Sequence, residues 1–450
     1  MNTQKQTRRE WLTIATAAVA VPMFIPRTVF ADARRPGAND RIGIAGIGVG
    51  RQGAGIFANA VRDARANAVA ICDGSKVRGI EVAAERGVPE NSVYQDYRKV
   101  IDRKDVDAIV TATPEQWRSL ICVNAALAGK HLFVEKPVTL TVEDGVLIRK
   151  AAKETGIVFQ SGSQQRSDLP NYLACKAIRE GKLGKITEII AANYESPWID
   201  NMPGEPVPEG LDWDLWCGPA KLVPFNSQIL IARGDPGWIS FRAYSGGEMT
   251  GWGTHGLDQI QCALGMDETG PVEIFVDGPT LVPPVYDKPE SRQRGEALCS
   301  VPYLSYKYAN GITVRLGVFE ERDGQIVKTA ESNRGGGIFV GEKGKVEIFR
   351  NRVTSNPSEL AEEWLNEGAD VRLPSHMTDW INCIYDGKKP ICDMEAGIRC
   401  ASLCHILNIA RYVGRNLKWD PVKEEFVGDA EANTWLKREH RKGFEQPVVV

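Results

Sequence analysis

IGIAGIGVGRQG, residues 42–53, is the stretch that places this chain in a fold class. A mostly apolar run leads directly into Gly48-Val49-Gly50-Arg51-Gln52-Gly53, which has the pattern G-x-G-x-x-G. In such a unit a strand ends in a tight glycine turn, the backbone approaches a pyrophosphate, and the next helix points its N-terminal amides at the phosphates. Asp73 lies 20 residues beyond Gly53, where a carboxylate accepts hydrogen bonds from the adenosine ribose. This order predicts a dinucleotide-binding Rossmann unit.

The residues around Asp73 bear on which dinucleotide binds. Asp73 is followed by Gly74 and Ser75 rather than by an arginine. A 2′-phosphate would meet a negative charge with no adjacent cation, so NAD is favoured over NADP. Lys76 and Arg78, slightly further on, keep NADP as the alternative.

A second informative stretch is HLFVEKP, residues 131–137. Its apolar run is short and is bounded by turn signals, which is typical of a buried strand. Glu135 and Lys136 then lie at the carboxyl end of that strand, where open α/β sheets hold their ligands. The proline allows a cis bond after Lys136. We expect the Lys136 ammonium group to lie beside the bound dinucleotide.

The spacing of apolar runs divides residues 41–450 into three parts. Over residues 41–160 short apolar runs alternate with helical patterns, which indicates βαβ units and a doubly wound parallel sheet. Residues 161–375 contain further strand-like runs, and we expect an α+β domain with a large, mostly antiparallel open sheet. Residues 376–450 are predicted to form C-terminal helices and a polar tail. The expected strands are 41–47, 68–72, 108–112, 131–134 and 157–160 in the first part, and 186–194, 272–276, 313–319, 338–340 and 345–349 in the second.

Residues 1–31 have the layout of an export signal. Thr7-Arg8-Arg9-Glu10-Trp11-Leu12 matches the twin-arginine pattern, a weakly apolar stretch follows, and Val29-Phe30-Ala31 supplies a cleavage site with a small residue. The alternative is a chance arginine pair before an ordinary helix. We expect twin-arginine export to the periplasm and a polar linker over 32–40. No stable membrane anchor is expected, because the apolar run is shorter than the roughly 20 residues that span a bilayer.

Composition argues against several classes of protein. A net charge of −3 over 450 residues offers no basic surface for nucleic acid. The 10 cysteines include no Cys-x-x-Cys pair and have no histidine cluster beside them, so no metal site is expected. We interpret these cysteines as small buried apolar residues.

Further short motifs occur in order along the rest of the chain. They are Thr113-Pro114-Glu115-Gln116-Trp117, Ala128-Gly129-Lys130-His131 leading into Glu135-Lys136-Pro137, Gly162-Ser163-Gln164-Gln165-Arg166, Trp216-Cys217-Gly218-Pro219, Gly246-Gly247, Trp252-Gly253-Thr254-His255-Gly256-Leu257-Asp258 and Trp419-Asp420-Pro421. In this order they resemble the Gfo/Idh/MocA oxidoreductases, which include glucose–fructose oxidoreductase and the inositol dehydrogenases. The resemblance covers Arg41 to nearly the C-terminus. It implies a Rossmann domain, an α/β domain whose open sheet often forms a homodimer or homotetramer face, and a sugar or polyol bound between the domains.

The resemblance also implies roles for single residues. Lys136 would hydrogen-bond the reacting hydroxyl and stabilise the alkoxide as it forms. His255 is the candidate base, because histidine titrates near neutrality and this one would face the cofactor domain. Asp258 lies one helical turn further on, so it would orient the imidazole or bind a sugar hydroxyl. Predicted cofactor contacts beyond the fingerprint are Asp73, Thr113, Pro114, Trp117, Glu135 and Lys136, and predicted substrate contacts are Lys136, Gln165, Arg166, Trp252 and His255.

Two positions depart from the family pattern. The inositol dehydrogenases have an aspartate four residues before the histidine, and Gly251 stands there in this chain. Either another acid substitutes, or His255 acts with Lys136 alone. Arg118 stands where many relatives have histidine. We interpret it as a solvated arginine, with contact to an anionic substrate such as a uronic acid as the alternative.

Several aromatic residues are candidates for stacking on a sugar ring. We expect one or two of them to contact the ligand and the others to lie in the core. They are Trp117, Tyr194, Trp198, Trp213, Trp238 and Trp252.

Three hypotheses for the function remain open. The first is NAD-dependent oxidation of a secondary alcohol of a sugar or polyol, with the cofactor carried tightly bound because no free NAD pool is expected outside the cytoplasm. The second is a redox-neutral NAD-dependent glycosidase or lyase, in which transient oxidation allows elimination and the hydride is then returned. The run Thr254-His255-Gly256-Leu257 is similar to exported glycosidases of this kind. The third is a non-catalytic sugar-binding or scaffold protein, which only Gly251 supports.

Overall fold

The computed structural model describes residue 37 and residues 40–234, 236–288, 298–322, 325–330 and 334–449. The predicted leader, residues 1–31, lies outside these residues, as does most of the predicted linker 32–40. Among the described residues, no helix combines the length and the apolar character needed to cross a membrane.

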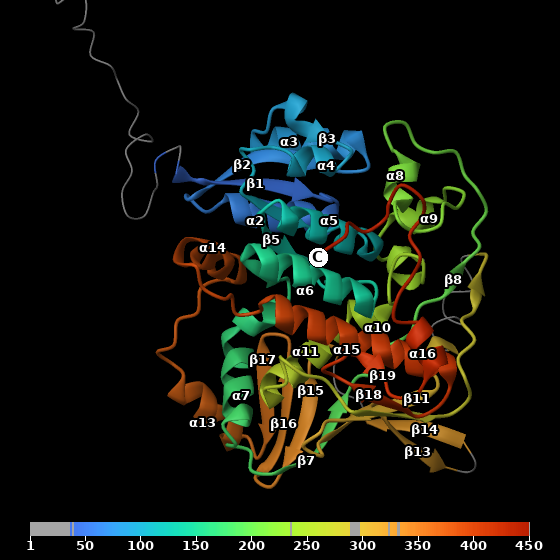
Figure 1. Cartoon of the computed structure of the whole chain (residues 1–450). Helices are drawn as coiled ribbons and strands as arrows, with labels where there is room; N and C mark the ends of the chain where they lie inside the picture. The colour runs from blue at the N-terminus through green and yellow to red at the C-terminus, as the bar shows by residue number, and fades with distance from the viewer. Residues whose placement is uncertain are drawn as a thin grey trace, which may run out of the picture.

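The N-terminal domain is built on a six-stranded parallel sheet in the order β3-β2-β1-β4-β5-β6 (Figure 1). This is the strand order of the dinucleotide-binding Rossmann fold, so the predicted fold of this domain is confirmed. The two-residue strand β3 was not predicted. The strands are β1 (Ile42–Ile47), β2 (Ala66–Cys72), β3 (Val93–Tyr94), β4 (Ala108–Thr111), β5 (His131–Val134) and β6 (Phe159–Ser161).

Helices cover both faces of this sheet, which explains why its strands are apolar without alternation. Ile44 of β1 points into a core shared with α2, α3 and α14, while the next residue, Ala45, points into a core shared with α5 and α6. Both side chains have no exposed surface. The helices of this layer are α2 (Arg51–Val61), α3 (Lys76–Arg86), α4 (Arg98–Ile101), α5 (Glu115–Leu127), α6 (Val142–Thr155) and α14 (His376–Asp386).

The second domain contains a nine-stranded sheet in the order β17-β16-β15-β7-β12-β11-β9-β18-β19. All neighbours are antiparallel except β7 and β12, so the prediction of a mostly antiparallel sheet is confirmed. The strands are β7 (Ile186–Ala191), β9 (Glu273–Asp277), β11 (Tyr303–Lys307), β12 (Thr313–Leu316), β15 (Gly337–Gly341), β16 (Gly344–Phe349), β17 (Arg352–Asn356), β18 (Leu417–Asp420) and β19 (Glu425–Phe426). Two small pairs lie apart from it, β8 (Ile199–Asp200) with β10 (Val285–Tyr286) and β13 (Val318–Arg322) with β14 (Gln325–Ala330).

One face of the large sheet packs against helices. Leu257 and Ile260 of one helix and Leu407 of another join Val314 and Phe339 of the sheet in a single apolar core. The helices of the second domain are α7 (Leu169–Arg179), α8 (Trp213–Cys217), α9 (Ser227–Leu230), α10 (Glu248–Gly251), α11 (Gly253–Leu264), α13 (Glu359–Glu367), α15 (Met394–Val413) and α16 (Ala430–Thr434).

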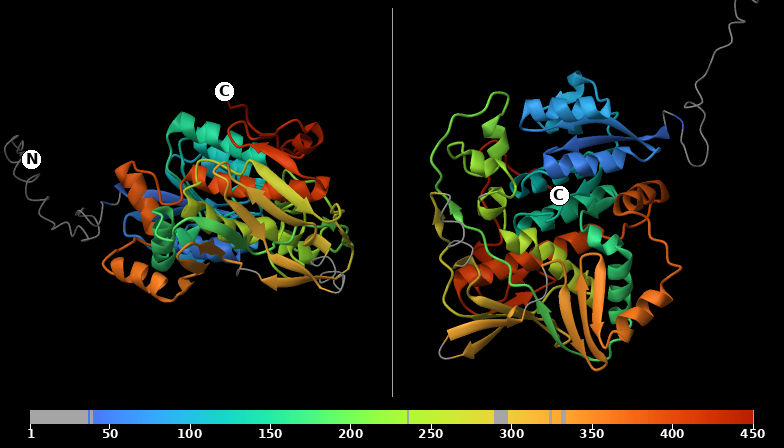
Figure 2. Two further views of the ribbon diagram at one scale, coloured as in Figure 1. Left: turned by 90° about the horizontal axis from the view of Figure 1, so that it is seen from below. Right: turned by 180° about the vertical axis from the view of Figure 1, so that it is seen from behind.

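The C-terminal part does not form a layer of its own. Helix α15 runs between the domains, with Ile398 in the Rossmann core and Leu407 in the core of the second domain (Figures 1 and 2). Strands β18 and β19 form one end of the large sheet, although they lie in the segment predicted as helices and tail. The last residues also pack back, since Phe444 lies edge-on to Trp117 with 5.4 Å between ring centroids.

Candidate active site

A cavity of about 680 Å³ lies where the two domains meet. The fingerprint loop and the ends of β4 and β5 form one wall, and residues from α11 and from the 211–239 segment form the other. Most of the predicted site residues line it. They are Gly48, Gly50, Arg51, Gln52, Gly53, Asp73, Thr113, Pro114, Trp117, Glu135, Lys136, Trp252 and His255.

Each of the three fingerprint positions favours glycine for a different physical reason. Gly48 has φ +75°, and a Cβ there would lie 2.7 Å from Thr113. A Cβ on Gly53 would lie 1.9 Å from the carbonyl oxygen of Gly48, so only glycine allows the helix to start this close to the strand. A Cβ on Gly50 would meet no protein atom within 4 Å, and Gly50 lines the cavity. The space left at Gly50 fits a pyrophosphate approaching the backbone.

Asp73 holds this loop in place. Its Oδ2 accepts a hydrogen bond from the backbone N–H of Val49 at 2.8 Å, and its Oδ1 accepts one from that of Ser75 at 2.9 Å. Burial raises the pKa of the Asp73 carboxyl, while these hydrogen bonds oppose the rise. A carboxylate oxygen has more than one lone pair, so both oxygens retain acceptor capacity toward the cavity. The wall around Asp73 therefore fits the ribose end of a dinucleotide.

Lys136 lies at the end of β5, as predicted, and the bond from Lys136 to Pro137 is cis. Its Nζ donates a hydrogen bond to the carbonyl oxygen of Gly251, at 3.0 Å across the domain junction. Burial, followed by the positive charges of Arg233 and Arg118, lowers the pKa of Lys136, and Glu135 opposes this effect. The Lys136 ammonium group is thus fixed to the second domain at the floor of the cavity.

The position of the missing aspartate is filled by an ion pair. A Cβ on Gly251 would lie 2.7 Å from Oε2 of Glu248 and 3.0 Å from a guanidinium nitrogen of Arg233. These two side chains pair through two hydrogen bonds of 3.0 Å each. Glu248 therefore places a carboxylate against Gly251 from one helical turn earlier, and an aspartate at 251 would clash with it.

His255 lies on α11 and is only 7% exposed. Its ring centroid is 5.5 Å from that of Trp252, and its Nδ1 has no hydrogen-bond partner among the described residues. Burial, and then the positive charges of Lys136, Arg350 and Arg233, hold the pKa of His255 well below its usual value. The imidazole is therefore neutral near neutral pH and can accept a proton.

Three predicted site residues, Asp258, Gln165 and Arg166, do not line the cavity. Asp258 does not hydrogen-bond His255, because both of its oxygens accept from Arg166 at 2.8–3.1 Å. Gln165 turns away and donates to the carbonyl oxygen of Gly335. The residue of this turn that lines the cavity is the preceding one, Gln164.

The interpretation of Arg118 as a solvated arginine is wrong, because its side chain is buried. It is only 2% exposed, and its guanidinium donates to the backbone carbonyl oxygens of Thr113 and Pro137. It lines the cavity, but these bonds commit it to shaping the two loops that carry the motifs of residues 113–117 and 135–137.

The aromatic candidates divide into two groups. Trp117, Trp238 and Trp252 line the cavity, whereas Tyr194, Trp198 and Trp213 do not. Trp216 lines the cavity as well and was not among the expected platforms. Other cavity residues absent from the sequence-based set of contacts include Tyr97, Gln164, Arg233 and Arg350. Arg233 and Arg350 follow no local motif, so no sequence signal identified them.

Two family models together match almost all of the chain after residue 40. The Gfo/Idh/MocA model for the NAD-binding Rossmann fold matches residues 41–163, and the model for the C-terminal alpha/beta domain of the same oxidoreductase family matches residues 182–446. The chain therefore belongs to the Gfo/Idh/MocA oxidoreductase family. Its N-terminal domain is an NAD-binding Rossmann domain, as predicted.

Individual relatives match shorter stretches. The scyllo-inositol 2-dehydrogenase (NAD(+)) of Bacillus subtilis is 34% identical over 140 residues, which are 31% of this chain and 40% of that protein. A glycosyl hydrolase family 109 protein of Shewanella pealeana is 27% identical over 180 residues, which are 37% of this chain and 39% of that protein. The matches span about two fifths of these relatives' own length. A solved structure of levoglucosan dehydrogenase with NADH and levoglucosan shares the fold, with a TM-score of 0.53 and 17% identity over 84% of this chain and 99% of that one.

Proposed function

We propose that the protein is an NAD-dependent oxidoreductase that acts on a secondary alcohol of a sugar, polyol or sugar derivative. The observation that carries the proposal is that Lys136 and His255, from different domains, line one cavity with the NAD fingerprint loop. Similarity to inositol and levoglucosan dehydrogenases supports the substrate class.

The chain's own residues supply the proton chemistry. NAD, when bound, accepts the hydride from the substrate carbon. Lys136 Nζ, which donates to the Gly251 carbonyl in this structure, can donate instead to the substrate hydroxyl and stabilise the developing alkoxide. The buried neutral imidazole of His255 can accept the hydroxyl proton. The ring of Trp252 beside His255 offers an apolar surface for the sugar.

The pH dependence of turnover tests these two roles together. His255 must be neutral to accept a proton, and because its pKa is depressed, we expect kcat/KM to start falling only at a pH below 6.5. Lys136 must be protonated to donate, and its lowered pKa places the alkaline fall below pH 10.5.

For His255→Ala we expect a loss in kcat/KM of about 10²–10⁴-fold that shrinks at high pH, where hydroxide replaces the base. A loss that is independent of pH would assign His255 to binding instead.

Substitution of Gly50 tests the cofactor site without disturbing the fold. A side chain at Gly50 meets no protein atom, so we expect Gly50→Val to fold normally but to bind NAD about 10- to 100-fold more weakly by blocking the pyrophosphate. Gly55→Val is the matched control, because Gly55 lies on α2, the helix that Gly50 precedes, also faces open space, and does not line the cavity. Equal NAD affinity in the two variants, measured by calorimetry, would contradict this placement.

A redox-neutral glycosidase or lyase is the second candidate. The similarity to a glycosyl hydrolase family 109 protein favours it. In this chain such a reaction would use the same NAD site, Lys136 and His255. Cleavage of an aryl glycoside with constant NAD absorbance would select this candidate. Net NADH formation from a free sugar would select the dehydrogenase, and tight sugar binding without NAD would select a non-catalytic protein.

Export, retention of the cofactor and assembly complete the proposal. We propose that residues 1–31 direct twin-arginine export with NAD already bound, and that the protein is a homodimer or homotetramer.

The first test of a carried cofactor is an ultraviolet spectrum and mass analysis of the small molecules released when the purified mature protein is denatured. Stoichiometric NAD or NADH supports a carried cofactor, whereas an empty protein that binds NAD weakly favours a conventional dehydrogenase acting before export.

A further inference from the structure

The part of the cavity around His255 is rich in positive charge. Three basic side chains line it, namely Lys136 at the end of β5, Arg233 before the 3₁₀ turn that starts at Trp238, and Arg350 between β16 and β17. They come from three separate segments, so no local motif groups them. Each of these three positive charges lowers the pKa of the His255 imidazole, so all three lie near enough to act on it.

The acids of the cavity wall have other partners. Asp73 binds the fingerprint loop, Asp96 pairs with Arg98 at 2.8 Å, and Glu135 accepts from Gln52 Nε2 at 3.0 Å. Two acids still act on the cations, because Glu248 pairs with Arg233 and Glu135 opposes the lowering of the Lys136 pKa. Of the three cations, only Arg233 forms an ion pair within the described part of the chain.

Arg233 is held in a definite orientation. Its Nε and one terminal nitrogen donate to Glu248, and its guanidinium carbon lies 5.8 Å from the centroid of the Trp252 ring. The other terminal nitrogen has no partner among the described residues. Because its side chain is 44% exposed and lines the cavity, this nitrogen is available to a ligand.

Arg350 is presented by a well-anchored hairpin. Asn171 Nδ2 donates to the carbonyl oxygen of Phe349 at 2.8 Å, and the amide of Asn351 contacts the carboxylate of Asp168. Arg350 itself makes no ion pair or hydrogen bond within the described parts of the chain. Arg350 acts electrostatically on Asp168, where it opposes the rise that burial causes in the pKa of that carboxyl. The backbone is fixed on both sides of a guanidinium that is free to bind an anion.

We propose that the substrate is an anionic sugar, and that Arg350 together with Arg233 binds its carboxylate or phosphate beside the hydroxyl that faces Lys136 and His255. The forked guanidinium donors suit either oxyanion. This inference rests on the proposed function, since it names the class of substrate for the same cavity. It also moves anion recognition away from Arg118, whose donors are committed to backbone carbonyls.

The test compares matched anionic and neutral sugars. With the NADH-loaded protein, affinities for D-glucuronate, D-glucose 6-phosphate and D-glucose, and for the corresponding galactose series, are measured by calorimetry. We expect at least one anionic sugar to bind about 10-fold or more tightly than its neutral parent, because charge-assisted hydrogen bonds are stronger than those to a neutral group. The uronate and phosphate arms show which oxyanion the site takes. Anionic sugars that bind no better than the neutral ones would overturn the proposal.

Variants then test which arginines bind the anionic group of the sugar. We expect Arg350→Gln to remove most of the anionic preference, and Arg233→Gln with Glu248→Gln to reduce it without leaving an unpaired charge. Arg352→Gln is the matched control, because Arg352 follows in the same hairpin but packs on Phe349 and does not line the cavity. A preference that survives in both test variants would overturn the assignment. Binding is measured apart from NADH formation, so uronate binding without oxidation would refute the proposed reaction and not this inference.

Discussion

We expect Lys136→Met to lose about 10²–10³-fold in kcat while its NAD content stays at the wild-type level. Lys136 is half-buried, and methionine keeps an apolar chain of similar length while it removes the ammonium group. That group joins the cofactor domain to α10 through its 3.0 Å hydrogen bond to the Gly251 carbonyl. Without it, nothing at this position stabilises the alkoxide as the hydride leaves.

Two further measurements make this result specific to Lys136. Single-turnover reduction of bound NAD separates the chemical step from product release, and the loss should appear in that step. Lys136→Arg should recover little, because a guanidinium is larger and does not share the lowered pKa of the buried amine. A Lys136→Met enzyme with wild-type single-turnover rates would remove Lys136 from the mechanism of either candidate reaction.

The cofactor half of the site could be predicted because its residues lie in local motifs. Gly48, Gly50 and Gly53 follow one strand directly, and Asp73 ends the next, so sequence spacing alone brings them together. Lys136 could be placed for the same reason, since a short apolar strand must end at a defined edge of a parallel sheet.

The substrate half could not be predicted in the same way. Arg233 and Arg350 reach the cavity only because the loop after α9 and the β16–β17 hairpin fold against it, and neither segment carries a local signal. Gln165 and Arg166 were predicted to line the cavity, but Gln164 lines it instead. A 3₁₀ turn over Gln164–Ser167 sets the direction of each side chain there, and sequence pattern does not specify that turn.

Some strands were missed although a signal was present. Tyr303–Lys307 alternates buried and half-buried residues, and Asn310-Gly311 follows before the predicted strand β12. Alternation followed by Asn-Gly indicates a hairpin, which the structure contains as β11 and β12. By contrast, β18 and β19 are short and complete the sheet from the far end of the chain, so only the tertiary fold defines them.

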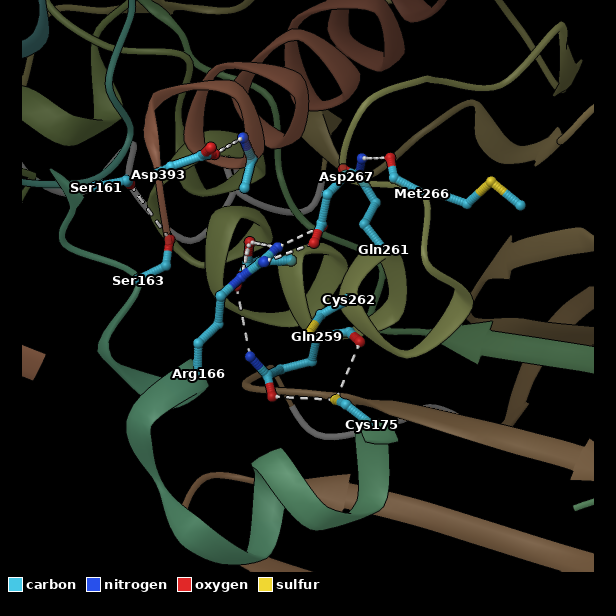
Figure 3. Close-up of polar contacts among 12 residues, drawn as sticks. Ser161, Ser163, Arg166, Cys175, Gln259, Gln261, Cys262, Met266, Asp267 and Asp393 are labelled. Atoms are coloured by element: carbon cyan, nitrogen blue, oxygen red, sulfur yellow. Dashed lines mark hydrogen bonds and ion pairs between the residues drawn. The ribbon is translucent and has the colours of Figure 1, made fainter. Parts of the chain in front are cut away.

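The largest effect on stability is expected at Arg166, which shows why this residue is structural. Arg166 is 3% and Asp258 1% exposed, and they share three hydrogen bonds between the segment after β6 and α11. Arg166 also reaches Asp267 at 2.7 Å (Figure 3). We expect Arg166→Met to lower the free energy of unfolding by about 3–5 kcal/mol, because it leaves the Asp258 carboxylate buried without its partner.

Chemical denaturation of three variants distinguishes this explanation from a simple loss of packing. Asp267→Asn should cost about 1 kcal/mol or less, because Asp267 is 31% exposed and Asp258 still balances Arg166. The double variant Arg166→Met with Asp258→Leu should regain much of the loss, since it removes both buried charges at once. A double variant no more stable than Arg166→Met would contradict the unpaired-carboxylate explanation. Because Asp258 and His255 lie on the same helix, the ion pair holds the base in the cavity although neither of its members touches the ligand space.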